Sequence, residues 1–305
     1  SSFWRNTGRF GMGKDVDCSK MIGYEFEQFN AIEKWKLEEP SVLTKAFGTV
    51  AKPVAWMVQK LIPQGAIESV LKGLNALASK FSDREDIIRD GGIERIRDLR
   101  DRRKKSLEEC DRLADNVHNW AVGAASVEGG VTGAVGIVGI AIDTPAILTM
   151  GLRVIYKIGL CYGYEFNDEA DKQFVLGILS VASANTMTEK TTSLVLLKQM
   201  SVLVAKTAWK NMAEKGVIGS AVITIRNLAK QIGINITKRK AMQAIPVVGA
   251  GVGAAMNAKY INDIAWAARR TFQERWLRDN DLLNDVDCGE DENSENTENT
   301  EYAES

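Results

Sequence analysis

Apolar positions in this 305-residue chain recur every three or four residues rather than at every second residue. That spacing places apolar side chains on one face of an α-helix, whereas alternation at period two is typical of a strand. Residues 20–80 are predicted to form several short amphipathic helices separated by Pro40, Pro53 and Pro63, because proline ends or bends the helix before it. No segment alternates long enough to predict a sheet. The pattern predicts an all-α, multi-helix bundle.

Two longer helices are predicted in the rest of the chain. One runs from about Asp83 to Ala121, with a second from Asn257 to Leu277. The apolar face of the first is expected to hold residues at three- and four-residue spacing: Ile93, Ile96, Leu107, Cys110, Leu113, Val117 and Trp120.

Two uncharged segments are rich in glycine. Gly129–Ile142 lies between the two long helices, and Ala241–Ala258 leads into the second of them. A protein core is normally filled by branched side chains at high density, so repeated glycine indicates the close approach of another helix, a phosphate or a lipid. Gly129 and Gly133, and likewise Gly249 and Gly253, lie one helical turn apart, which lets two helix backbones approach closely. The sequence therefore predicts glycine-rich apolar helical hairpins, packed either within a soluble core or against lipid.

These segments are short for a membrane span. They contain 14 and 18 uncharged residues, and a helix that crosses a bilayer needs about 20. Extending the first segment would place Glu128 or Asp143 in hydrocarbon, at a cost on the order of 2.5–3.5 kcal/mol each. Ordinary spans are therefore not expected. Two helices that meet at Asp143, Thr144 and Pro145 would instead form a hairpin able to enter a membrane partway.

The charge is unevenly distributed along the chain. The net charge is -1, but residues 279–305 contain eleven Asp or Glu and no Lys or Arg, which leaves 39 basic and 29 acidic residues elsewhere. The composition predicts an N-terminal extension at residues 1–19, a helical domain at residues 20–278 and a disordered acidic tail at residues 279–305. The tail is either a solubilising appendage or a competitor for a basic face of the same protein.

A basic run precedes the first glycine-rich segment. Residues 89–105 hold eight Arg or Lys against four acids. The run is either a solvated helix face, with pairs such as Asp98 and Arg102, or a surface attracted to anionic lipid. Nucleic acid is not expected as a partner, because no binding motif and no interleaved aromatic residues accompany the charges. The candidate basic surface consists of Arg100, Arg102, Arg103, Lys104 and Lys105.

Candidate chemistry is sparse. Gly8–Asp15 has the spacing of a phosphate loop, but Asp15 replaces the Ser or Thr that would bind magnesium. Gly249–Ala254 matches a dinucleotide-binding fingerprint without the strands that it requires. His118 is the only histidine and is expected on a helix surface, and the four cysteines have no metal-binding spacing and favour a reducing compartment. No catalytic residue, metal or cofactor is predicted.

Several short motifs, taken in order, give the chain a family resemblance. They are Trp35 with Pro40, Ile62-Pro63, the glycine run that ends in Asp143-Thr144-Pro145-Ala146, Cys161-Tyr162-Gly163-Tyr164, Phe174-Val175-Leu176, Ile245 to Ala250, Asn257, and Phe272 to Leu277. Over about residues 20–278 the chain resembles the EcsC protein family, bacterial proteins whose namesake is encoded beside an ABC transporter. The resemblance implies a mainly helical protein that associates with membranes, and it supplies no catalytic residue. The candidate lipid-facing or helix-packing residues are Gly129, Gly133, Gly136, Asp143, Pro145, Tyr162, Gly163, Pro246, Gly249, Gly253 and Asn257.

We therefore expect a non-enzymatic protein that associates, peripherally or conditionally, with the cytoplasmic face of the inner membrane. Its expected partners are anionic lipid and, as a further option, a membrane transporter or another protein. Three alternatives remain open at this point. They are a soluble scaffold, a hydrolase of lipid or envelope material that uses Glu128, Asp143 or Tyr162, and a pore-forming effector.

Overall fold

The computed structural model describes residues 20–21, 23–40, 73, 106–132, 136–166, 169–210, 228, 230–239 and 249–283. Every regular element within these residues is a helix, so the all-α prediction is confirmed. Residues 230–239 are helical, and the longer helices are α1 (Tyr24–Leu37), α7 (Leu107–Thr132), α8 (Gly136–Cys161), α9 (Glu169–Ser183), α10 (Met187–Lys210) and α12 (Gly249–Asp279).

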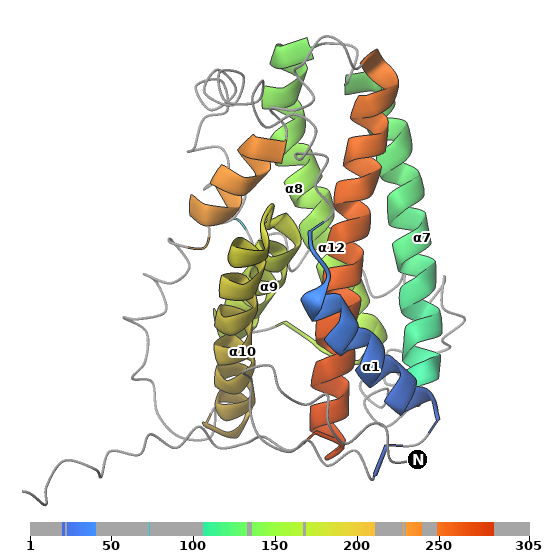
Figure 1. Ribbon diagram of the computed structural model, residues 1–305, viewed down its shortest axis with the longest axis vertical. Helices are drawn as coiled ribbons and strands as arrows, with labels where there is room; N and C mark the ends of the chain where they lie inside the picture. Colours follow the sequence, from blue (N-terminus) through green and yellow to red (C-terminus); the bar gives the residue numbers. More distant parts are fainter. Residues whose placement is uncertain are drawn as a thin grey trace, which may run out of the picture.

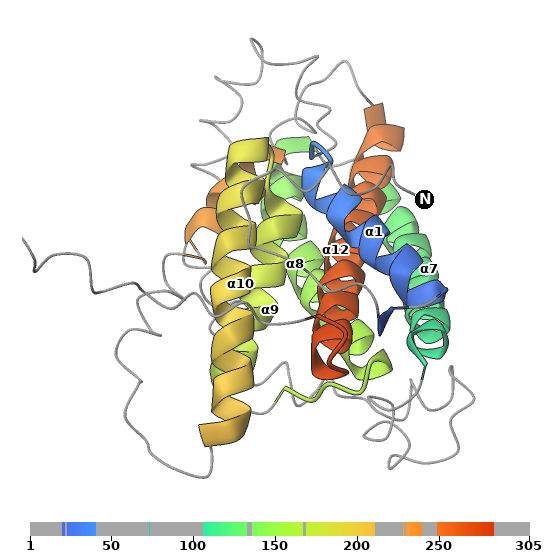
Figure 2. The same cartoon turned by 60° about the horizontal axis from the view of Figure 1, so that its bottom comes forward.

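Helix α12 is the central element of the described bundle, because it packs against α1, α7, α8 and α9. Figure 1 shows α7, α8 and α12 running along the long axis, with α9 and α10 at one side and α1 crossing α12 obliquely. The turned view in Figure 2 shows the same order. The core between these helices is filled by fully buried rings and aliphatic side chains, including Tyr156, Phe174, Phe272, Leu148 and Leu152.

Helix α7 differs from the prediction at its start. Ser106 is not helical, and its Oγ accepts a hydrogen bond from the backbone N–H of Glu109 at 3.3 Å. This is the N-cap arrangement that satisfies an unpaired donor of the first turn. The helix expected from Asp83 to Ala121 is therefore interrupted before Leu107, and α7 continues beyond Ala121 to Thr132. Residues 83–105 lie outside the described residues.

The expected apolar face of α7 is only partly right. Leu107, Cys110 and Leu113 are buried, but the Trp120 side chain is 54% exposed. Trp120 lies instead beneath two cations of α8, with the Arg153 guanidinium 5.8 Å and the Lys157 ammonium 5.4 Å from its ring centroid. The face that packs inward is completed by small residues, Ala114, Ala121 and Ala125.

The hairpin turn expected at Asp143, Thr144 and Pro145 is also wrong in position. Helix α8 runs continuously from Gly136 to Cys161 and contains Pro145. Proline removes one backbone hydrogen bond from a helix interior, so packing of α8 against both α7 and α12 must offset that loss. The α7–α8 connection is therefore residues 133–135, about ten positions earlier than expected, and it lies outside the described residues.

Glycine does bring helices close together, at positions within the core. A Cβ atom added to Gly151 would lie 2.6 Å from Cδ1 of Ile264, and one added to Gly159 would lie 2.8 Å from Cζ of Phe272. Carbon atoms in ordinary contact are separated by at least 3.5 Å. Helices α8 and α12 can pack this closely only because both α8 positions lack a side chain.

Substitution at one of these glycines should be costly. We expect Gly159→Ala to lower the free energy of unfolding by roughly 1–3 kcal/mol, because the Phe272 ring and the Phe166 ring would both have to move. Gly123→Ala is the matched control, since Gly123 is in α7 and its added Cβ meets nothing within 4 Å. That change should raise stability by about 0.5–1 kcal/mol. Urea unfolding measures both, and equal effects of the two changes would contradict the packing described.

Candidate functional site

A buried carboxylate joins four segments of the bundle. The side chain of Asp111, on α7, is 1% exposed. The Tyr24 hydroxyl of α1 donates to its Oδ2 at 2.7 Å, and the Tyr162 hydroxyl, just after α8, donates to its Oδ1. The Gln273 amide of α12 lies 2.7 and 2.8 Å from the two oxygens. A buried charge is tolerated only when its hydrogen-bonding capacity is met in this way.

A second layer of polar contacts surrounds this carboxylate. Arg270 donates through Nη1 to Oε1 of Gln28 at 2.9 Å and to Oε1 of Gln273 at 2.8 Å. Arg269, which is buried, forms an ion pair with Asp115 one turn along α7 from Asp111. The positive charge of α12 is therefore held beside the acidic residues of α7, which fixes how the two helices are aligned.

The two tyrosines act as donors over a wide pH range. Burial and the neighbouring Asp111 carboxylate raise the pKa of Tyr162 well above its ordinary value, with Arg269 opposing the shift. Burial and the hydrogen bond to Asp111 raise the pKa of Tyr24 as well. A neutral phenol can donate to a carboxylate, and a phenolate cannot. The cluster is therefore built to hold helices together rather than to exchange protons near neutral pH.

The turn after α8 explains why a glycine lies between two tyrosines. Gly163 has a φ of 81°. The backbone N–H groups of Gly163 and Tyr164 donate to the carbonyls of Leu160 and Gly159, at 2.9 and 3.0 Å. This is the Schellman arrangement, in which a left-handed residue, usually glycine, ends the helix. The turn directs Tyr162 to Asp111 and the Tyr164 hydroxyl to Oδ2 of Asp279, at 2.9 Å.

Both tyrosine rings also pack on Phe272 of α12. Their ring centroids lie 6.1 and 5.6 Å from that of Phe272, with interplanar angles of 22°. Phe166 and Phe174 meet the same ring edge-on, at 5.9 and 5.7 Å. Such aromatic pairs add to the stabilisation from burial. This cluster accounts for the sequence motifs around Tyr162, Phe174 and Phe272.

The sequence expectation for His118 is wrong, because its side chain is buried rather than on the helix surface. Its Nε2 lies 2.9 Å from Oδ1 of Asn262 on α12, and its ring meets Trp266 edge-on at 5.2 Å. Burial lowers the pKa of His118, as does Arg269, whereas Asn262 and Asp115 oppose the shift. His118 is therefore held as the neutral imidazole between α7 and α12.

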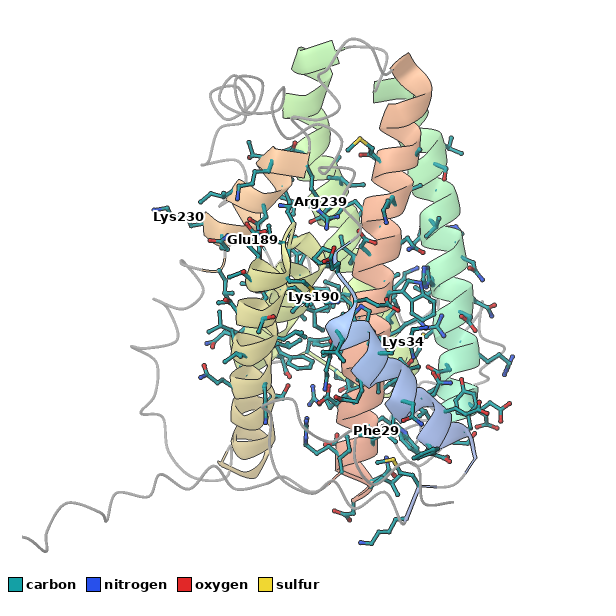
Figure 3. All side chains as sticks on the ribbon, in the orientation of Figure 1. Phe29, Lys34, Glu189, Lys190, Lys230 and Arg239 are labelled. Atoms are coloured by element: carbon teal, nitrogen blue, oxygen red, sulfur yellow. The ribbon has the colours of Figure 1, made fainter. Side chains whose placement is uncertain are left out.

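A cavity of about 420 Å³ lies between α1, the α9–α10 turn, residue 239 and α12. Its lining includes Trp35 and Trp266, small residues such as Ala31, Ala182 and Ala184, and charged residues of both signs. Figure 3 labels three of its cations, Lys34, Lys190 and Arg239, which come from three different helices. The lining does not include Asp111 or Tyr162, but it includes Arg270 of the second polar layer, so the cavity lies beside the Asp111 cluster.

Lys190 lines this cavity beside the C-terminal end of α1. Its ammonium donates to the backbone carbonyls of Glu38, at 2.7 Å, and of Trp35, and it lies 4.9 Å from the Trp35 ring centroid. Those carbonyls belong to the C-terminal end of α1, where a cation is favoured. Burial lowers the pKa of Lys190, with Glu38 and Asp263 opposing the shift.

Arg239 lines the cavity from the helix at residues 230–239. It forms an ion pair with Asp263 at 3.0 Å and donates to the backbone carbonyls of Ala182 and Ala184 at 3.0 and 2.9 Å. Its guanidinium also lies 5.1 Å from the Tyr260 ring centroid. These contacts fasten the helix at residues 230–239 to the α9–α10 turn and to α12.

A separate feature lies at one end of the bundle. Polar contacts pair Asp111 with Gln273 and His118 with Asn262, so α7 and α12 run antiparallel. Ile264 and Phe272 lie opposite Gly151 and Gly159, each 113 positions later in the chain, so α8 and α12 run parallel. The same offset separates Gly136 and Gly249, the first residues of α8 and α12, so the two helices begin at the same end of the bundle. The end of α7 and the starts of α8 and α12 therefore meet, as Figures 1 and 2 show.

This charge-free end, formed by residues 129–132, 136–142 and 249–258, contains no charged residue. The exposed residues of α7 also become uncharged toward this end of the bundle. Exposed residues of the first half of α7 include Glu108, Glu109 and Arg112, whereas those from Asn116 to Val127 are uncharged. Val127, close to the charge-free end, is 75% exposed. Charge is concentrated at the Asp111 end, and Glu128, which precedes Gly129, is the last charged residue of α7 before the charge-free end.

Among the described residues, one helix contains a stretch long and apolar enough to cross a bilayer, Thr144–Cys161 of α8. Of this stretch, 72% is buried inside the bundle. The core helix of a water-soluble protein has the same length and composition. The stretch is therefore accounted for by packing.

The structure places the sequence-predicted residues in three groups. Tyr162, Gly163 and Asn257 belong to the buried core or its turns, and Pro145 is within α8. Gly129, Gly136, Gly249 and Gly253 belong to helices at the charge-free end, and Asp143 lies seven positions into α8. The remaining candidates, Gly133, Pro246, Arg100, Arg102, Arg103, Lys104 and Lys105, lie outside the described residues.

Tyr162 lies far from Asp143, a second residue of the hydrolase alternative, and the side chain of the third, Glu128, is not among those that the structure describes. Asp143 and Tyr162 are 19 positions apart along one helix and its cap, which separates them by roughly 28 Å. Tyr162 is also fully buried against Asp111. No group of three His, Cys, Asp or Glu that could hold a metal ion occurs within the residues that the structure describes.

Comparison with known proteins agrees with the motifs. The model of the EcsC protein family matches residues 27–277. The chain belongs to the EcsC protein family. It is also similar to an uncharacterized protein, YdbA, of Bacillus subtilis strain 168, with 24% identity over 260 residues that cover 82% of this chain and 91% of that protein. No solved structure matches the chain.

A pH-dependent stability should follow from His118. In the unfolded chain the imidazole of His118 has a pKa of about 6.5, and in the folded protein its pKa is lower. At a pH between these two pKa values, the unfolded state therefore binds more protons than the folded state. The wild-type protein should therefore lose stability as the pH falls from 7.5 through this window, relative to His118→Gln, which cannot titrate. Urea unfolding at several pH values measures the difference. A difference between the two proteins that does not change with pH would contradict a buried neutral imidazole.

Proposed function

We propose that this EcsC-family protein associates peripherally or conditionally with a membrane, and that the charge-free end of the bundle is the part that contacts lipid. The observation that supports this proposal is the assembly of residues 129–132, 136–142 and 249–258 at one end. The last of these segments is far from the first two in the sequence, and the parallel and antiparallel packing of α7, α8 and α12 brings all three to one end. A charge-free surface made of several elements favours contact with an apolar phase.

The size of this end suits the interface of a bilayer rather than a span. The first charged residue of α12 is Lys259, ten residues from Gly249, or roughly 15 Å along the helix. In α8 it is Asp143, seven residues from Gly136, or roughly 10 Å. In α7 it is Glu128, four residues from Thr132, or roughly 6 Å. Helices that lie in the interface bury apolar surface to a depth of about 5–10 Å. The charge-free end therefore fits partial entry into one leaflet.

In this proposal the basic run contributes an attraction to lipid that is separate from the contact of the charge-free end. Lys105 is two residues before Leu107, which begins α7 at the opposite end. Helix α7 has 26 residues and is roughly 39 Å long, whereas the seven-residue step from Leu107 back to Arg100 covers at most about 25 Å. The candidate basic surface, Arg100 to Lys105, and the charge-free end therefore cannot share one contact when the bundle stands on its charge-free end. Attraction to anionic lipid is thus a second, separable contribution.

The proposed location at the cytoplasmic face of a membrane follows from the cysteines of the chain. Cys110 and Cys161 are buried in the core as thiols rather than as a disulfide, which suits a reducing compartment and thus the cytoplasmic face of a membrane. The alternative is a soluble scaffold, and the burial of most of Thr144–Cys161 within the bundle favours it.

Vesicle flotation at low salt separates these possibilities. The wild-type protein should float with phosphatidylcholine vesicles and more fully with vesicles that contain phosphatidylglycerol. Val127, beside the charge-free end, and Ala255, within it, are exposed, and the double change V127E/A255E should reduce the bound fraction several-fold. A carboxylate that enters the interface loses hydration, at a cost that rises from near zero at the surface to roughly 2.5–3.5 kcal/mol at the bilayer centre.

The matched control is F26E/L37E, which places two carboxylates on exposed apolar positions of α1. It changes the net charge by the same amount and should bind as the wild type does. Equal loss in both double variants would contradict a contact through the charge-free end. A wild-type protein that floats with neither vesicle would contradict membrane association altogether and favour the soluble scaffold.

A further inference from the structure

We propose that the cavity between α1, α9, α10 and α12 is a binding site for a small soluble compound that carries a phosphate or carboxylate group beside a planar or apolar part. Its volume of about 420 Å³ falls within the range of small-molecule sites, about 300–1,000 Å³. Like those sites, it combines apolar walls with a few polar groups. This inference is independent of membrane association.

Positive charge in the cavity is only partly neutralised. Four lining residues are cationic and three are acidic, which leaves one net positive charge: Lys34, Lys190, Arg239 and Arg270 against Glu38, Glu39 and Asp263. Arg239 is paired directly with Asp263. Among the described residues, Lys190 donates only to backbone carbonyls and Arg270 only to side-chain amide oxygens, all of them uncharged.

Both cations keep donors for a ligand. An ammonium has three N–H donors and a guanidinium has five. Lys190 uses two donors on the end of α1, and Arg270 uses only its Nη1 on Gln28 and Gln273. Burial lowers the pKa of Lys190, and burial together with Arg269 lowers the pKa of Arg270. An anion placed between them would supply the missing counter-charge, and charge-assisted hydrogen bonds are the strong ones.

The walls select for a flat or apolar group beside the anion. Trp35 and Trp266 contribute two indole rings, and Ala31, Ala182 and Ala267 contribute small apolar surfaces. Lys190 lies 4.9 Å from the Trp35 ring centroid, and Arg270 lies 4.8 Å from that of Trp266. Each of the two cations is therefore already placed beside an indole ring.

The position of the cavity indicates a compound taken from solution. Asn262, its lining residue nearest the charge-free end on α12, is 13 residues from Gly249, or roughly 20 Å along the helix. A lipid headgroup held by an end-on bundle would remain within the interface and would not reach this level. Binding should therefore occur with the protein alone, without vesicles.

Isothermal titration calorimetry of the full chain tests the proposal, with phenyl phosphate, benzoate and benzyl alcohol as probes. At least one of the two anions should bind saturably at one site, and the uncharged benzyl alcohol should not. Lys190→Met should weaken binding by roughly ten-fold or more, which is the effect of losing a charge-assisted hydrogen bond. Lys230→Gln is the matched control, because Lys230 is exposed and outside the lining, as Figure 3 shows, and its affinity should be unchanged.

A second variant covers the case in which Lys190→Met fails to fold. Ala31→Phe leaves every charge in place and fills the cavity from α1, so it should abolish binding while the circular dichroism spectrum stays helical. Failure of both anions to bind the wild-type protein would overturn the proposal. So would binding that Ala31→Phe leaves unchanged, or binding of benzyl alcohol as tight as that of the anions.

Discussion

The buried Asp111 carboxylate is the contact on which the arrangement of this bundle depends. Its two oxygens are met by Tyr24, Tyr162 and Gln273, which come from α1, the turn after α8 and α12. Leaving a buried charge without its partners costs several kcal/mol. A shift of any of these segments by one residue would break at least one bond to the carboxylate. The alignment of four segments is therefore set at this end of the bundle.

That alignment has a consequence at the other end. With α12 antiparallel to α7 and parallel to α8, the charge-free residues of all three helices reach one end together. The bundle becomes polarised along its long axis, with the Asp111 cluster and aromatic rings at one end and helix segments without charged residues at the other. The proposed membrane contact is a result of this polarity. The cavity beside α1 lies between the two ends and has its own, separate chemistry.

Local sequence patterns predicted the helices well but not their partners. The period of apolar residues located α12, and the motif around Gly163 marked a true helix end with a φ of 81°. Periodicity alone does not say which side of a helix meets another, and it misplaced both His118 and Trp120. Pro145 predicted a turn, but packing against α7 and α12 kept α8 helical.

The Asp111 cluster could not be seen in the sequence at all. Its partners are 51, 87 and 162 positions away, and an aspartate on a charged helix has the same local pattern as any solvated carboxylate. The cavity was missed for a similar reason, because its four cations come from four helices distant in sequence. The order of the family motifs, in contrast, identified the EcsC family over residues 27–277.

The most direct measurement of the central claim is fluorescence quenching by brominated lipid. Val127 is replaced by cysteine and labelled with an environment-sensitive dye, in a chain whose Cys18 and Cys288 are replaced by serine. This label would report contact of the charge-free end with lipid. The same label at Leu37, an exposed apolar position on α1, would report the side of the bundle. The account predicts strong quenching at position 127 and none at position 37. Equal quenching at the two positions, or quenching only at position 37, would contradict it.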